Sequence, residues 1–245
     1  MFRTANPSMK EQVYTDRAGA FEAPMTVTGT VGKTGILLAI LVATAAFGWT
    51  QASMPLMLAG LVVGLILAIA TIVKPQWAPI TAPFYAAAEG LLVGTISVIY
   101  ATMFADSKWS NIVPLAVLST FVVLAVMLGL YLTRIIRVTE TFRMVVIGAT
   151  AGIMLTYLAT LGLSFFFPGV WNLAIYQAGP IGIVFSVGVI VIAALNLALD
   201  FDIIETGVEA KAPKYMEWYA GFSLLVTLVW LYLEILRLFS KLARR

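Results

Sequence analysis

The stretch that decides the fold is IVPLAVLSTFVVLAVMLGLYL, residues 112–132, which contains no charged side chain. A helix needs about 20 apolar residues to cross the roughly 30 Å hydrocarbon core of a bilayer. Six more runs of comparable length occur, and almost every charged residue lies in the gaps between the runs. The seven runs are 34–50, 55–73, 80–104, 112–132, 144–167, 180–200 and 215–239. The sequence therefore predicts an all-α polytopic membrane protein, a bundle of seven transmembrane helices.

Composition and organisation agree with this prediction. Hydrophobic residues make up 61% and charged residues 11% of the chain, against about 45–50% and 25% in soluble proteins. The gaps are too short for a second folded domain. Residues 1–30 are polar and show no apolar periodicity, and the first apolar run does not have the layout of a signal peptide. We expect a cytoplasmic, partly disordered tail at 1–30 and a membrane domain at 31–245.

The positive charges predict an orientation in the bilayer. Cytoplasmic loops carry an excess of lysine and arginine, and the tail and one set of gaps hold ten of them, whereas the opposite internal loops hold only Lys108. The ten are Arg3, Lys10, Arg17, Lys33, Lys74, Arg134, Arg137, Arg143, Lys211 and Lys214. The amino terminus is therefore expected in the cytoplasm. Four cations conflict with this if the last helix crosses fully: Arg237, Lys241, Arg244 and Arg245. A short or re-entrant last helix would resolve the conflict.

The absence of cysteine and histidine removes several kinds of chemistry. Disulfides, thiolate nucleophiles, histidine-ligated metals and serine–histidine hydrolysis are excluded. No span interior holds a lysine for a retinal Schiff base, and the last span has no aspartate for an aspartyl protease. We therefore expect no enzyme activity and no cofactor. We also expect no nucleic-acid partner, because the net charge of +3 comes from lysines and arginines in the loops and the tail. Ca²⁺, which prefers oxygen ligands, fits the remaining side chains.

Three carboxylates break the charge pattern: Glu89, Asp200 and Glu234 lie within or at the ends of apolar runs. An ionised group at mid-bilayer costs roughly 2.5–3.5 kcal/mol, so each needs a partner, a water-filled cavity or a proton. Glu89 has small neighbours, which indicates that another helix packs against it. It is expected to be either protonated or paired with a cation, with Arg143 as a candidate by depth. A neutral glutamate hydrogen-bonded to a neighbouring helix is the alternative.

The end of span six is NLALDFDIIETG, residues 196–207. Asn196 and Asp200 are four residues apart and share one helix face, whereas Asp202 and Glu205 share another. This spacing favours Asp200 as the inward-pointing residue. It assigns Asp202 and Glu205 to a solvated helix end near the lysines of the following loop.

Span seven carries a polar stripe at heptad-like spacing, formed by Ser223, Thr227, Trp230 and Glu234. Its hydroxyl groups could donate to a carboxylate on a facing helix. Glu234 and Arg237 are three residues apart and can pair with each other, as an interfacial clamp or as part of a gate.

Small residues four apart allow close helix packing in membranes. Three spans contain such a pair: Gly60 and Gly64, Gly90 and Gly94, Gly148 and Gly152. Together these pairs indicate a tight bundle.

These features together resemble the Bax inhibitor family, the transmembrane Bax-inhibitor-motif proteins. The features are the seven spans, the Glu-Gly pair at 89–90, the acidic end of span six and the run LYLEILRLF at 231–239. The likeness covers residues 31–242 and is strongest over 200–242. The Asn-Pro pair at 6–7 resembles a bacterial branch, which implies the bacterial cytoplasmic membrane.

The resemblance implies a pH-sensitive Ca²⁺ leak, in which two aspartates on the last two helices share a proton and close the pore. Deprotonation, or competition by an arginine, would open such a latch, because two nearby carboxylates resist double ionisation. The first family aspartate follows an aromatic residue, as Asp202 follows Phe201 here. The second lies in a Leu-Tyr-Leu-Asp run, where this chain has Glu234. Asp200 is a reserve partner, and all three carboxylates are candidates for transient Ca²⁺ contact.

The resemblance also covers a second class of function, a non-conducting regulator that binds and modulates a membrane quality-control protease. Such a role needs only an accessible tail and exposed helix faces. The bilayer is the expected partner in both cases, with Ca²⁺ or H⁺ in the first and a membrane protease in the second. The oligomeric state is left open.

Overall fold

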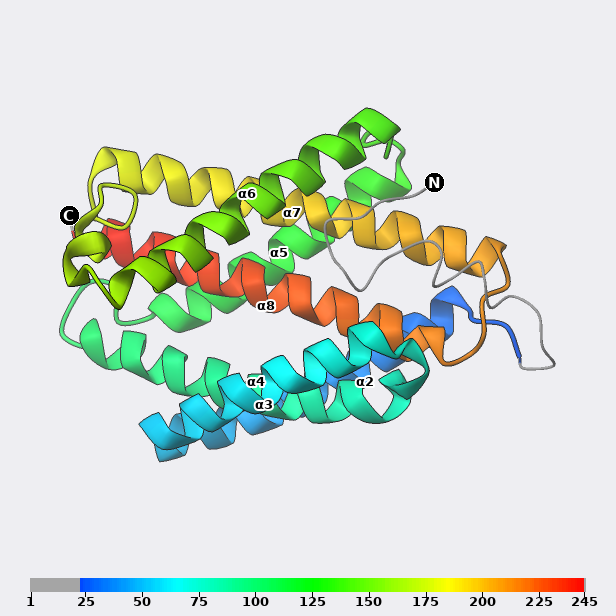
Figure 1. The fold of residues 1–245 in the computed structure, drawn as a ribbon, viewed down its shortest axis with the longest axis horizontal. Helices are drawn as coiled ribbons and strands as arrows, with labels where there is room; N and C mark the ends of the chain where they lie inside the picture. The colour runs from blue at the N-terminus through cyan, green and yellow to red at the C-terminus, as the bar shows by residue number, and fades with distance from the viewer. Residues whose placement is uncertain (1–22, 245) are drawn as a thin grey trace.

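The computed structural model describes residues 23–244, in which seven long helices form one bundle (Figure 1). The helices are α2 (Val27–Gln51), α3 (Met54–Val73), α4 (Ala78–Met103), α5 (Ile112–Leu132), α6 (Glu140–Ser164), α7 (Pro180–Glu209) and α8 (Met216–Ala243). Short 3-10 turns, Pro75–Trp77 and Pro168–Asn172, precede α4 and follow α6. Each of the seven is long and apolar enough to cross a membrane, which confirms the predicted fold.

The bundle has two ends, which we name from α2. The proximal end is where α2 begins at Val27 and α7 ends at Glu209, on the right of Figure 1. The distal end is where α2 ends at Gln51 and α8 ends at Ala243.

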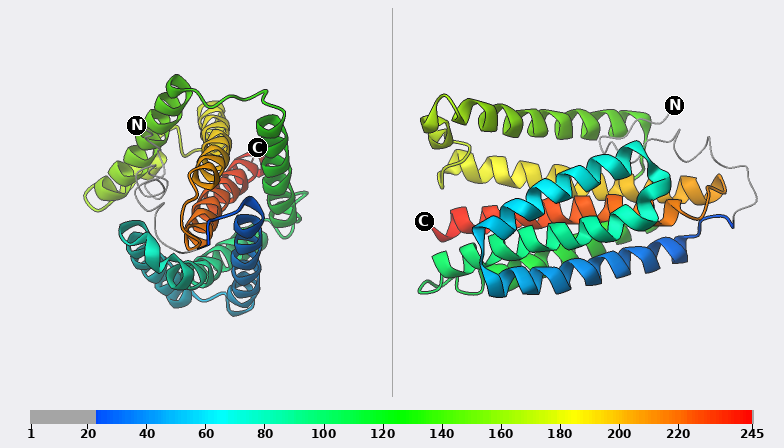
Figure 2. Two further views of the ribbon diagram at one scale, coloured as in Figure 1. Left: turned by 90° about the vertical axis from the view of Figure 1, so that its right-hand side faces the viewer. Right: turned by 60° about the horizontal axis from the view of Figure 1, so that its bottom comes forward.

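Helix α8 lies at the centre of the bundle and packs against α2, α4, α5 and α7 (Figure 2, left). Its fully buried side chains include Tyr219, Phe222, Leu225, Leu231 and Leu236. By contrast, α6 buries only Arg143, Val146 and Thr160. The last span is therefore the core of the bundle, and α6 is a peripheral helix.

The alternative of a short or re-entrant last helix is wrong. Helix α8 has 28 residues, which at 1.5 Å per residue makes it about 42 Å long, more than the hydrocarbon core. Arg237, Lys241 and Arg244 therefore lie towards the distal end, and Arg245 lies outside the described residues.

Helix α2 begins earlier than its apolar run, inside the segment expected to be tail; residues 1–22 of that segment lie outside the described residues. Thr26 caps the helix by accepting a hydrogen bond from the backbone nitrogen of Gly29 at 2.9 Å. Glu217 of α8, which is fully buried, accepts bonds from the backbone nitrogen and the hydroxyl of Thr26, both at 3.0 Å. A side chain at Gly29 would overlap this carboxylate. The proximal ends of α2 and α8 are thus joined by hydrogen bonds.

Two of the three glycine pairs bring helices into close contact. A methyl group at Gly60 would lie 2.7 Å from the backbone oxygen of Ala88 on α4, and one at Gly94 would overlap the backbone of α2. The third pair is different, because Gly148 and Gly152 have no neighbouring atom within 4 Å of such a methyl group. The tight part of the bundle is therefore α2, α3 and α4.

Candidate functional site

Helix α6 is joined to α7 and α8 by polar contacts at regular intervals. The contacts are Arg143 to Asp202, Thr150 to Asn196 and Tyr157 to Glu234. The α6 residues are seven apart, so they share one helix face and extend over about 21 Å of its axis. We call the whole row the polar seam: Arg143, Thr150 and Tyr157 of α6; Asn196, Asp200 and Asp202 of α7; and Thr227, Glu234 and Arg237 of α8.

The proximal part of the seam is an ion pair between Arg143 and Asp202, with the guanidinium 2.5 Å from Asp202 Oδ2. Arg143 also donates to Glu140 at 3.1 Å. The Arg143 side chain is 7% exposed and that of Asp202 is 18% exposed. The assignment of Asp202 to a solvated helix end is therefore wrong, because α7 continues to Glu209 and buries this residue against α6.

Glu205 lies outside the seam, at the surface of the proximal end. Arg134 lies 2.5 Å from Glu205 Oε1, and Tyr131 donates to the other carboxylate oxygen. The side chains of Arg134 and Glu205 are 59% and 36% exposed. Glu205 is therefore partly solvated, as its spacing predicts, but its partner is Arg134 at the end of α5 rather than a loop lysine.

Asp200 occupies the buried middle of the bundle. Thr227 Oγ1 donates to Asp200 Oδ2 at 2.7 Å, and both residues are buried. The Thr227 hydroxyl also lies 3.3 Å from the backbone oxygen of Ser223, one turn earlier on α8. This geometry confirms that Asp200 points inward and that a hydroxyl of the α8 stripe faces it.

The distal part of the seam is a cluster of three side chains, of which Glu234 is buried and Tyr157 and Arg237 are partly exposed. Glu234, 2% exposed, accepts a bond from Tyr157 at 2.9 Å. Arg237 donates to both oxygens of Glu234, at 2.9 and 3.1 Å, and to the Tyr157 hydroxyl at 2.8 Å. The predicted Glu234–Arg237 pair is confirmed. Tyr157 was not predicted, although its spacing of fourteen residues from Arg143 places both on one face of α6.

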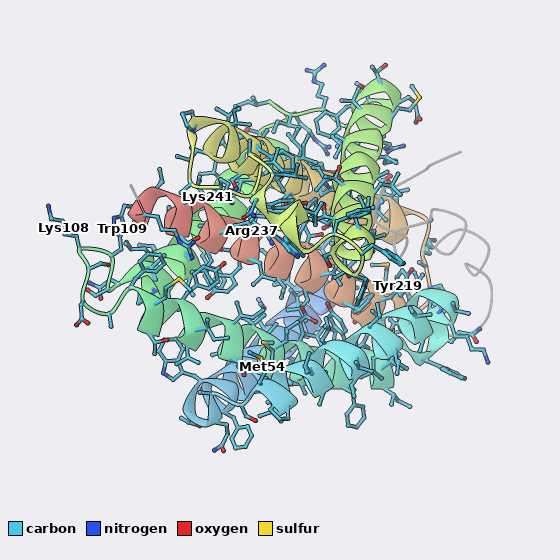
Figure 3. All side chains as sticks on the ribbon, turned by 60° about the vertical axis from the view of Figure 1, so that its left-hand side comes forward. Met54, Lys108, Trp109, Tyr219, Arg237 and Lys241 are labelled. Atoms are coloured by element: carbon cyan, nitrogen blue, oxygen red, sulfur yellow. The ribbon has the colours of Figure 1, made fainter. Side chains whose placement is uncertain are left out.

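Beyond this cluster, Lys241 joins the end of α8 to the segment between α6 and α7. Arg237 and Lys241 are labelled on the distal half of α8 in Figure 3. Lys241 is buried, and its ammonium donates to the backbone oxygens of Ile175 and Gly182 and to the hydroxyl of Ser186, at 2.7, 2.9 and 2.9 Å. These three partners are neutral oxygens.

The two carboxylates of the expected latch do not meet. Asp200 faces Thr227, so the antiparallel helices α7 and α8 are in register at that point. Glu234 lies seven residues distal to Thr227, about 10 Å, and Asp202 lies two residues proximal to Asp200, about 3 Å. Their axial separation is therefore about 13 Å, and each has its own arginine instead of a shared proton.

Glu89 is not part of the seam. It faces α3, where a methyl group at Gly64 would lie 3.3 Å from Glu89 Oε2, and its hydrogen-bond partner is Tyr85, one turn earlier. The small neighbours did predict the close helix. Arg143, the cation suggested for Glu89, pairs with Asp202 instead.

Within residues 23–244, no three aspartates or glutamates lie together as a ready metal-binding group. Asp200, Asp202 and Glu234 are each engaged by side chains of the protein. A cation could reach them only after those contacts separate.

A family model described as Bax inhibitor 1 like matches residues 6–244, nearly the whole chain. No curated protein matches the sequence.

Proposed function

The chain belongs to the Bax inhibitor 1-like family of membrane proteins, and from that premise we propose that it is a pH-sensitive cation leak that conducts Ca²⁺ along the polar seam. The observation that carries the proposal is the row of polar side chains on α6 at seven-residue spacing. Ionisable residues inside a membrane are costly and mark ion pathways. A row of about 21 Å is a large part of the hydrocarbon thickness.

In the described arrangement the seam is closed. Ca²⁺ takes six to eight oxygen ligands at about 2.3–2.6 Å, and the arginines already occupy the oxygens of Asp202 and Glu234 that it would need. A path therefore requires α6 to move away from α7 and α8. Because α6 buries so few of its side chains, moving it breaks fewer packing contacts than moving α7 or α8 would.

One ion pair and one tyrosine hydroxyl hold α6 in place, and this replaces the shared-proton latch with two separate contacts. The contacts are Arg143 with Asp202, and Tyr157 with Glu234 and Arg237. Protonation of Asp202 removes the charge that holds Arg143, and protonation of Glu234 weakens the hydrogen bond that it accepts from Tyr157 of α6. Acidification is therefore expected to release α6 and raise the flux.

The test is Ca²⁺ flux into proteoliposomes at pH 6 and pH 8. Asp202→Asn and Glu234→Gln, which remove the charge at nearly constant shape, are expected to raise the flux at pH 8 and flatten the pH dependence. Glu205→Gln is the matched control, because it neutralises an exposed carboxylate on the same helix outside the seam. No flux above empty liposomes at either pH would refute the leak and leave the protease regulator as the working proposal, to be tested by co-purification with membrane proteases.

A further inference from the structure

A groove opens sideways in the bundle, on the opposite side of α8 from the polar seam. Its volume is about 580 Å³; α2 and α5 form the walls, and α4 and α8 form the floor. Leu228, Val229 and Tyr232 line it from α8. At 100° per residue these three lie across the helix from Thr227 and Glu234, so α8 separates the groove from the seam.

Apart from the indole of Trp49 at its mouth, the groove offers a ligand only polar side chains that are already hydrogen-bonded. Four hydroxyl side chains line it, and each is already hydrogen-bonded. Thr50 and Thr120 donate to backbone oxygens of their own helices, both at 2.8 Å. Ser97 lies 2.6 Å from a backbone oxygen of α4 and 2.6 Å from the Tyr232 hydroxyl, to which it is paired. Burying further polar groups against this surface would cost free energy without a compensating bond, so the occupant must be apolar.

The length and depth of the groove match one leaflet of a bilayer. On α2 it extends from Leu38 to Thr50, a rise of about 18 Å along the helix axis, whereas half of the hydrocarbon core is about 15 Å. Thr50 is the penultimate residue of α2 and Val113 the second of α5, so the groove starts at the distal interface. Trp49 lies at this mouth, where aromatic residues mark the interface.

We propose that the groove binds one acyl chain of a phospholipid from the leaflet at the distal end. The bilayer brings such chains to the open side, where Val42 on α2 and Val117 on α5 are exposed. A transmembrane helix of a second copy is the competing occupant, which a chain-to-chain cross-link through the floor residues would reveal.

The test uses a phosphatidylcholine with a photoreactive diazirine in its acyl chain, reconstituted with the full chain in liposomes. After illumination, the labelled residues are mapped by mass spectrometry. We expect label on the floor at Ser97 and Tyr232, which are 4% and 7% exposed and which lipid around the bundle does not reach.

A matched pair of double variants decides the assignment. Val42→Trp with Val117→Trp places large side chains in the groove from both walls and is expected to lower floor labelling several-fold. Val62→Trp with Val126→Trp is the control, since these valines are similarly exposed but lie outside the groove. Labelling of the lipid-facing side of α6, at Leu155 and Leu158, should stay the same in both.

Three results would overturn the proposal. One is floor labelling in the wild type no higher than at the buried seam. Another is undiminished floor labelling in the Val42 and Val117 variant, with its fold verified by circular dichroism. The third is a chain-to-chain cross-link through the floor residues without lipid label, which would assign the groove to a second copy.

Discussion

The contact between Arg143 and Asp202 should contribute measurably to folding, and a double-mutant cycle tests it. Arg143→Gln and Asp202→Asn each leave the other charge without its main partner in a poorly solvated position. Breaking a buried ion pair costs about 3–5 kcal/mol. We expect about 2–3 kcal/mol for each single variant, because Asp202 retains some exposure and Arg143 keeps its contact with Glu140.

The double variant should cost much less than the sum of the singles, since it leaves no unpaired charge. A charge-assisted hydrogen bond is worth about 1.5–3 kcal/mol, so the expected coupling energy is of that size. Reversible unfolding of the purified protein in mixed micelles, followed by circular dichroism against the mole fraction of dodecyl sulfate, gives the four free energies.

The exposed pair of Arg134, in the loop after α5, and Glu205, on α7 as Asp202 is, provides the control cycle. Both of its side chains are at least one-third exposed, and exposed pairs contribute about 0.2–1 kcal/mol. If the effects of Arg143→Gln and Asp202→Asn simply add, or if both cycles give the same coupling, the argument that α6 is held by this contact fails.

Three further predictions concern other contacts. Tyr157→Phe keeps the ring but removes the hydroxyl between Glu234 and Arg237. It should lower the free energy of unfolding by about 1.5–3 kcal/mol, and an unchanged value in the dodecyl sulfate titration would contradict this. Lys241→Met removes three hydrogen bonds to the start of α7 and the segment before it, so amide exchange there should rise, and unchanged protection would show that the lysine does not anchor the segment. Gly60→Ala should destabilise the protein by about 1–3 kcal/mol, because the added methyl group overlaps α4. Gly148→Ala is the control and should not destabilise the protein, because its methyl group points into open space. Equal effects of the two substitutions in thermal melts would refute the packing argument.

The helix ends carry capping residues that lie outside the apolar runs of the sequence. Apolar runs mark the part of a helix that sits in hydrocarbon, but α2, α6 and α7 continue into polar residues. Thr26 and Thr139 cap α2 and α6 by accepting from backbone nitrogens three residues on, a pattern that is readable in the sequence. The longer α7 matters most, because it places Asp202 well inside the helix instead of at a solvated helix end.

The contacts of the seam show which pairs could be predicted. Glu234 and Arg237 are one turn apart on one helix, so helical geometry alone predicts their contact. The inward position of Asp200 followed from its spacing to Asn196. The partners of Asp202 and Glu234 on α6 are 59 and 77 residues away in the chain, and no spacing rule connects residues at such separations.

The sequence by itself determined the number, order and approximate extent of the helices, because each span must satisfy its own backbone hydrogen bonds and cover the hydrocarbon thickness. Periodicity also identified which side chains share a helix face. Only the tertiary structure decided which faces meet, since the rotation and neighbours of each helix depend on packing across the whole bundle. That packing keeps Asp202 and Glu234 apart, gives Asp202 its arginine and Glu234 its tyrosine from α6, and leaves an apolar groove on the other side of α8.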